Sequence, residues 1–461
     1  MSKVSSPLLQ KQVKPLGPPE MMMYALGFGA GSLVNLGFGT YLSFFWSDIA
    51  MIPLAAIGTI FAVSRLLDGG TDIFIGFMVD RTKTKYGKAR PWLLWMALPG
   101  AISLSMLYYV PNFSESGKII YAFVTYNLVA FFILTATTLP LQSILALITD
   151  DPKKRLNMSM LNNIVGTSFT VLSNMFVLQA IEKLGGGKDG YFKFFGMLAV
   201  VAAIMYIVAF LGTNERVQPA KGREKDRISV REALSLFVAN KWWVVITIFQ
   251  TFSFLYPSFM AINMYYMTWV MRDPSLMGPF MSAIFTAMLV VMILAAPIVP
   301  RVGKINAAFA AMFTQMIGNF LPLIIPGSVP ALMVAAVFRG AGPAILLGTS
   351  GAFMCDVVEY GEWHTGRRVE GLVFSAASMG GKIGAGLGGL VVAFLLARGG
   401  YVGGASAQTP QALGIITFIF TWCHAFGSIV CTILLFFLRK LDAQMPQIMA
   451  DLEARRNSTV S

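Results

Sequence analysis

The stretch "NERVQPAKGREKDRISVREALSLFVANK" (residues 214–241) is polar and charged, and it divides a predominantly apolar chain into two halves. Of the 461 residues, 56% are hydrophobic and only 12% are charged. Soluble domains carry about 25% charged residues. Apolar runs of the ~20 residues that a membrane helix needs lie on both sides of this stretch. We therefore predict an all-α membrane protein.

The apolar runs are separated by charged or Pro/Gly-rich breaks and predict twelve transmembrane helices, six in each half. Their expected ranges are 22–46, 52–79, 91–110, 119–147, 159–181, 194–213, 242–270, 277–300, 305–326, 330–355, 371–397 and 411–438. The expected domains are an N-terminal tail (1–21), a first bundle (22–213), a linker (214–241), a second bundle (242–438) and a C-terminal tail (439–461). A weak repeat, "YGKAR" at 86–90 and "VGKIN" at 302–306, relates the halves. This layout is typical of the major facilitator fold, in which substrate lies between the halves near the midplane.

The basic residues predict the orientation of these helices. If both termini and the linker are cytoplasmic, 26 of the 35 Lys and Arg residues lie inside and six lie outside. This distribution is what the positive-inside rule requires, and it accounts for the net charge of +13 without nucleic acid. We expect a multi-pass protein of a bacterial-type inner membrane, with both termini cytoplasmic and the lipid bilayer as its surroundings.

Several function classes lack support in the sequence. No GxxxxGK[ST] motif is present, so ATP-driven transport at a P-loop is not indicated. The three Cys residues have no metal or redox spacing, and there are only two His residues. We expect no cofactor, and no metal beyond a coupling Na⁺. A membrane enzyme or sensor remains an alternative, because carboxylates inside a membrane can be catalytic.

The second predicted helix and the loop after it, "SRLLDGGTDIFIGFMVDRTKTKYGKARPW" (64–92), contain two carboxylates within an apolar run. Asp68 and Asp72 are four residues apart, so they project from one face. Asp72 lies nine residues before Arg81, about 13–14 Å along a helix and close to the membrane centre. An Asp there costs roughly 2.5–3.5 kcal/mol on insertion scales. Arg65 can neutralise one carboxylate and a bound Na⁺ or H⁺ the other; the alternative is a structural Arg–Asp pair beside a wet cavity.

Other polar residues are expected to face the same cavity. Thr135, Thr138 and Gln142 lie at i, i+3 and i+7, and so form a polar stripe on the fourth helix. Lys382 lies near mid-membrane on the eleventh helix and either contacts the second helix or snorkels to the interface. On the glycine-rich first helix, Ser32 and Asn35 are further candidates, although the glycines can also serve close packing alone.

The loop after the second helix is a candidate cytoplasmic gate. Its charges can pair with those of the loop "CDVVEYGEWHTGRRVEG" (355–371) when the cytoplasmic side closes. Such ion pairs can favour one of two packing arrangements of the two bundles over the other. The alternative is a topology anchor that contacts lipid headgroups. The candidate gate residues are Asp80, Arg81, Lys88, Arg90, Asp356, Glu359 and Arg368.

These motifs resemble a known family. The 64–92 stretch, "DVVEYGEWHTGRRVEG" (356–371) with "SMGGK" (378–382), and "NFSESGKIIYAFVTY" (112–126) are similar to signatures of the glycoside–pentoside–hexuronide:cation symporters. The resemblance implies that Asp68 and Asp72 bind the coupling cation with Thr135 nearby, and that Lys382 interacts with this site. It also implies a sugar between the halves and a gate at Asp80 and Arg81.

The chain departs from the melibiose-type members at the expected sugar contacts. Where those members have Asp on the first and fourth helices, this chain has Ser32 and Thr138, and an expected Arg is replaced at Asn162 or Asn163. A family aromatic falls at Gln142. Arg339 adds a cation on the tenth helix, which favours a carboxylate-bearing substrate such as a hexuronide. The alternative is that Arg339 lies near the outer end of its helix and snorkels.

We therefore expect a monomeric, cation-coupled symporter of a glycoside or sugar acid, with substrate contacts from Ser32, Asn35, Thr138, Gln142, Asn163, Arg339 and Lys382. A second hypothesis keeps the fold but exchanges the cargo for an amphipathic lipid- or steroid-like molecule. The expected coupling ion is Na⁺ or H⁺.

Overall fold

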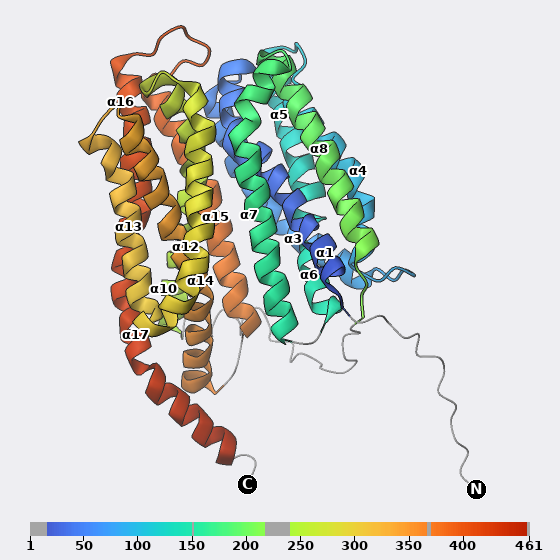
Figure 1. Ribbon diagram of the computed structural model, residues 1–461, viewed down its shortest axis with the longest axis vertical. Coiled ribbons are helices and arrows are strands. Elements are labelled where there is room, and N and C mark those ends of the chain that lie inside the picture. Colours follow the sequence, from blue (N-terminus) through green and yellow to red (C-terminus); the bar gives the residue numbers. More distant parts are fainter. Residues whose placement is uncertain (1–15, 150–151, 217–239, 367–369, 459–461) are drawn as a thin grey trace.

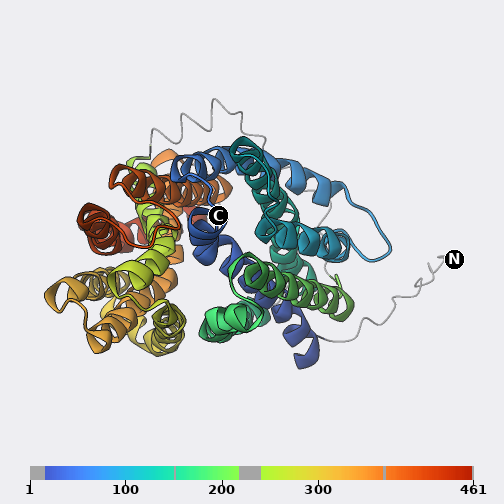
Figure 2. The same ribbon diagram turned by 90° about the horizontal axis from the view of Figure 1, so that it is seen from above.

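The computed structural model describes residues 16–149, 152–216, 240–366 and 370–458, and the regular elements in these ranges are helices. They form two groups that lie side by side, the first coloured blue to green and the second yellow to red (Figures 1 and 2). Helix α1 begins, and α17 ends, at the lower end of Figure 1. We name this end the terminal face and the opposite end the distal face.

The first half consists of α- and π-helical segments that run between these faces. They are α1 (Pro18–Asn35), η1 (Leu36–Tyr41), α2 (Leu42–Phe44), η2 (Phe45–Ile49), α3 (Leu54–Arg81), α4 (Arg90–Tyr108), α5 (Glu115–Val129), η3 (Ala130–Thr135), α6 (Thr138–Ile148), α7 (Pro152–Lys183) and α8 (Gly187–Gly212).

The second half repeats this arrangement. Its segments are α10 (Lys241–Ser258), η4 (Phe259–Ala261), α11 (Ile262–Tyr265), η5 (Tyr266–Val270), η6 (Pro274–Leu276), α12 (Met277–Val302), α13 (Lys304–Ile324), α14 (Val329–Thr365), α15 (Glu370–Arg398), α16 (Pro410–Phe418), η7 (Ile419–Cys423) and α17 (His424–Ser458). Most of the predicted linker, residues 217–239, lies outside the described residues.

Within the described ranges, eleven helical segments are long and apolar enough to cross a membrane. Helix α3 is not among them; it carries Arg65, Asp68 and Asp72 within its apolar sequence. Three predicted boundaries are wrong at the terminal face, because α7 begins at Pro152, α14 continues to Thr365 and α17 continues to Ser458. Hydropathy marks only the apolar part of a helix, and these polar extensions are held by contacts such as Trp363 Nε1 to Asp451 (2.9 Å).

Local sequence signals explain where many helices begin and end. Ser114, Asn240, Ser328 and Thr409 each accept a backbone N–H bond at the start of a helix, the usual role of such residues at an N-cap. Gly303 has φ = 89° between α12 and α13, a backbone region that favours glycine.

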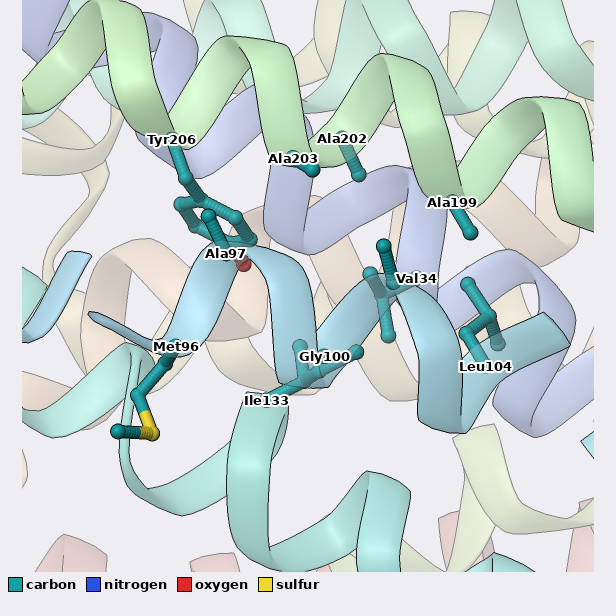
Figure 3. A pocket seen from close by; sticks show the side chains of 11 residues that line it. Val34, Met96, Ala97, Gly100, Leu104, Ile133, Ala199, Ala202, Ala203 and Tyr206 are labelled. Carbon is teal, nitrogen blue, oxygen red and sulfur yellow. The ribbon is translucent and has the colours of Figure 1, made fainter. Parts of the chain in front are cut away.

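Small side chains let neighbouring helices pack closely. In the first half, Ala199 and Ala202 of α8 face Ala97 and Gly100 of α4 around a small apolar cavity (Figure 3). In the second half, a Cβ added at Gly380 of α15 would lie 2.6 Å from a carbonyl oxygen of α10. The halves themselves meet where α3 packs on α15 and α7 packs on α12. Close helix packing through small residues is characteristic of membrane bundles.

Candidate functional site

The two carboxylates of α3 each contact a basic side chain, but the two partners come from different halves. Arg65 Nη1 lies 3.1 Å from Asp68 Oδ2, one turn away on α3 itself. Lys382 of α15 forms an ion pair with Asp72, so this pair joins the second half to the first. Thr135 Oγ1 donates to the other Asp72 oxygen at 3.1 Å. The structure thus brings Asp72, Thr135 and Lys382 together, with Asp68 one turn away on the same helix.

A π-helical turn explains why only one member of the predicted polar stripe reaches this cluster. Thr135 ends η3, and the extra residue in each π turn changes the helical phase of the residues that follow. Thr138 Oγ1 instead donates to the Ile133 carbonyl at 3.3 Å, while Gln142 is exposed. The predicted polar stripe at i, i+3 and i+7 assumed an uninterrupted α-helix, and the π-helical turn breaks that assumption.

A pocket of about 320 Å³ lies between the halves, beside this cluster. We call it the central pocket. Aromatic rings form much of its first-half wall, with Phe38 stacked on Tyr126 at 4.3 Å and Phe61 at 5.3 Å from Tyr126. Its lining residues are Asn35, Phe38, Gly39, Ser43, Phe61, Arg65, Tyr126, Leu134, Phe254, Pro257, Ser258, Ala261, Ala385, Gly389 and Val392.

Of the predicted substrate residues, Asn35 lines the central pocket. Ser32 packs against α7, because a Cβ added at Gly166 would lie 3.0 Å from its hydroxyl oxygen. Asn163 is exposed on α7. The aromatic wall was not predicted, because Phe and Tyr in an apolar helix carry no sequence signal that separates a binding wall from a lipid-facing surface.

Arg339 is 1% exposed, so the alternative that it snorkels to the membrane surface is wrong. Its Nε donates to the Gly318 carbonyl at 3.2 Å and its Nη2 to the Phe420 carbonyl at 2.5 Å, and the guanidinium lies 4.0 Å from the Phe420 ring centroid. Arg339 lines a second pocket of about 310 Å³ inside the second half, together with Gln250 and Gln315. We call it the second-half pocket.

The predicted gate residues at the terminal face make contacts within their own halves in this conformation. The Glu215 carboxylate accepts bonds from the backbone N–H groups of Lys88 and Arg90 at 2.9 Å each. In the second half, Asp356 pairs with Lys304 at 2.6 Å. Glu359 is half-buried on α14 and Arg81 stacks over Phe77. Arg368 and the side chain of Asp80 lie outside the described residues.

At the distal face, hydrogen bonds connect the two halves directly. Tyr265 pairs with Ser43 (3.2 Å) and Ser47 (2.8 Å), and Tyr401 donates to Asp48 at 2.5 Å. Trp269 Nε1 donates to Tyr401 at 2.8 Å. Burial raises the pKa of the Tyr401 phenol, which therefore stays protonated and able to donate. We name Ser43, Ser47, Asp48, Tyr265, Trp269 and Tyr401 the distal cluster; its members are far apart in sequence and were not predicted.

Comparison with known proteins identifies the family. Residues 23–442 match the family described as MFS/sugar transport protein. The chain belongs to this family. It is 31% identical to the isoprimeverose transporter of Lactiplantibacillus pentosus, over 95% of this chain and 91% of that protein. It is 29% identical to the inner membrane symporter YicJ of Escherichia coli, over 88% of each chain.

The fold agrees with this assignment. A structure of the nucleoside transporter NupG superposes with a TM-score of 0.66, at 15% identity, over 91% of this chain and 98% of that one. This major facilitator protein is therefore a multi-pass inner-membrane transporter and not an enzyme. The resemblance to glycoside–pentoside–hexuronide:cation symporters is confirmed at the level of the family.

Proposed function

We propose that this transporter is a symporter that couples uptake of a glycoside or sugar acid to Na⁺ or H⁺ by alternating access, with the ion at Asp68 and Asp72. The observation that carries the proposal is the ion pair between Asp72 and Lys382. It joins the two halves next to a pocket that both halves line. An ionisable pair inside a membrane is expensive and is usually kept for function.

The net charge of the residues around Asp72 indicates how a bound ion affects alternating access. Arg65, Asp68, Asp72 and Lys382 together are neutral, so a bound cation would leave one excess positive charge in a region of low dielectric constant. Na⁺ therefore replaces the Lys382 ammonium on Asp72, where Thr135 can supply a hydroxyl oxygen. Protonation of Asp72 weakens the same pair. Either ion loosens a link between α3 and α15 and so favours a different packing of the halves.

The orientation follows from the basic residues. We propose that the terminal face is cytoplasmic, since the described basic loop between α3 and α4 (81–90) lies there and the sequence places most other Lys and Arg residues on the same side. Helix α3 then crosses the membrane as a twelfth span, with its charges compensated internally. The distal cluster closes the outer side in this conformation, and the predicted gate pairs between Asp80, Arg81 and the 355–371 segment belong to the opposite conformation.

The central pocket is suited to a sugar. Its volume falls at the lower end of the range for small-molecule sites. Aromatic faces can stack on the C–H face of a pyranose, and Asn35 and Arg65 can donate to hydroxyl or ring oxygens. The isoprimeverose transporter among its relatives supports a glycoside. Substrate contacts by Ser32, Thr138, Gln142, Asn163, Arg339 and Lys382 stay predictions.

A second candidate cargo, an amphipathic lipid- or steroid-like molecule, is favoured by one observation. The second-half pocket is lined largely by apolar side chains, among them Phe285, Met288 and Leu347. Competition between isoprimeverose and a steroid without a sugar group, for binding to the purified protein, separates the two candidates.

Uptake into proteoliposomes tests the proposal. Each charge moved through 100 mV supplies about 2.3 kcal/mol, enough for roughly fifty-fold accumulation. We expect the wild-type protein to concentrate isoprimeverose when a Na⁺ or pH gradient is imposed. Asp72→Asn should lose accumulation but keep downhill exchange, whereas Asp189→Asn, an exposed carboxylate on α8, should behave as wild type. Gradient-driven accumulation that survives in the Asp68→Asn, Asp72→Asn double variant would refute the assigned ion site.

A further inference from the structure

Arg65 is the one residue that both lines the central pocket and contacts a carboxylate of the proposed ion site, among the residues that the structure describes. Its Nη1 binds Asp68, yet the side chain remains 27% exposed. A guanidinium has five N–H donors in a planar fork. One donor is engaged by Asp68 in the described contacts, so the others can reach a ligand in the pocket.

The position of Arg65 is set by the opposite half. A Cβ added at Gly386 of α15 would lie 2.8 Å from Arg65 Cγ, so the stem of Arg65 packs directly against the α15 backbone. One turn nearer the distal face, Phe61 packs in the same way against Gly389. Gly386 and Gly389 therefore leave room for the Arg65 and Phe61 side chains on the pocket-facing side of α3.

We propose that Arg65 is a positioning residue that links occupancy of the central pocket to the ion affinity of Asp68. Oxygen acceptors of a bound glycoside compete with Asp68 for the guanidinium, because hydrogen bonds from a charged donor are stronger than those between neutral groups. As Arg65 turns toward the sugar, Asp68 loses its counter-charge and attracts a cation. The inference rests on the proposed symport and adds the route by which substrate and ion strengthen each other.

This link must work in both directions. If the glycoside raises cation affinity by some factor, the cation raises glycoside affinity by the same factor. Coupling between sites is typically 5- to 150-fold. In Arg65→Gln we expect the factor to fall to about one, while cation affinity without sugar rises, because Asp68 is no longer occupied by Arg65. If the role of Arg65 were only structural, Arg65→Gln would lower the affinities for cation and for glycoside but leave the coupling factor unchanged.

The experiment is calorimetric titration of the purified full-length protein with isoprimeverose, in sodium chloride and in choline chloride at equal ionic strength, each at an acid and an alkaline pH. Gly386→Ala displaces the Arg65 stem without changing its charge and should reduce the coupling factor partially. Arg65→Lys keeps the charge and should restore part of it. Arg398→Gln, the same change at an exposed helix end, is the matched control and should keep the wild-type factor.

The outcomes separate the two proposals. Wild-type protein that binds no isoprimeverose, or binds it with no dependence on Na⁺ or pH, contradicts the proposed symport itself. Wild-type coupling that persists at full size in both Arg65→Gln and Gly386→Ala overturns the role of Arg65 and leaves the symport proposal standing. If Arg65→Gln does not fold, Gly386→Ala and Arg65→Lys decide the question by their coupling factors.

Discussion

At the scale of single residues, the partners of the buried charges matter more than their number. Arg65 and Asp68 lie on one helix, so their contact does not join the two halves. Asp72 and Lys382 lie on opposite halves, so their contact depends on how the halves are packed. Two carboxylates one turn apart thus have different environments and are suited to different roles.

The aromatic wall of the central pocket gives a prediction at this scale. Tyr126 stacks with Phe38 and lines the pocket, and an aromatic pair contributes about 0.5–1.5 kcal/mol beyond its buried area. We expect Tyr126→Ala to weaken isoprimeverose binding about ten-fold, with Tyr126→Phe close to wild type because stacking is retained. Titration calorimetry measures both; equal affinity in Tyr126→Ala would exclude this wall from the sugar site.

At the scale of helices, glycine positions set how closely α10 and α15 approach. A Cβ at Gly380 would lie 2.6 Å from the Thr247 carbonyl oxygen, and backbone cannot yield as a flexible side chain does. We expect Gly380→Ala to destabilise the protein by about 1–3 kcal/mol, as overpacking does. The thermal unfolding midpoint in detergent reports this change.

Gly351→Ala on α14 is the control for this prediction, because an added Cβ there meets nothing within 4 Å. Alanine in an unhindered helix position is about 0.5–1 kcal/mol better than glycine, so its midpoint should rise slightly. Equal midpoints for the two variants would show that the α10–α15 contact is not limited by glycine.

At the scale of the whole molecule, hydrogen bonds of the distal cluster join the two halves at the distal face. Tyr401→Phe removes the hydroxyl that bonds Asp48 and Trp269, two hydrogen bonds worth about 0.5–1.5 kcal/mol each. We expect the population with an open distal face to rise several-fold. Spin labels at Asp189→Cys and Ser406→Cys, in a background without the exposed Cys355, report the distance between the halves.

The matched control is Tyr109→Phe, since Tyr109 is an exposed tyrosine on the distal side of α4. A pH series adds a second measurement. Burial raises the pKa of Tyr401, so the cluster is fully formed below the ordinary tyrosine pKa of 10.0 and is lost only as the pH rises beyond it. Labels that separate between neutral pH and pH 9 would contradict this assignment.

Part of the candidate site could be predicted from the sequence. An acid pair in an apolar run must be compensated, so Asp68, Asp72 and Lys382 were identifiable from their membrane depth alone. The positions of Thr138 and Gln142 could not be foreseen, because a π-helical turn changes the phase of the fourth segment. The distal cluster combines residues more than 350 positions apart, such as Asp48 and Tyr401, which no local pattern connects.

The amino-acid sequence by itself determined that most segments are apolar enough to cross a membrane and that α3 carries charge, because hydropathy acts on each segment separately. The orientation stays a prediction from the positive-inside rule. Only the tertiary structure decided that Lys382 pairs with Asp72, that Arg65 faces the central pocket and that the halves are joined at the distal face. Those facts depend on how each helix is rotated and placed against helices from the other half, and such geometry arises only when both halves pack together.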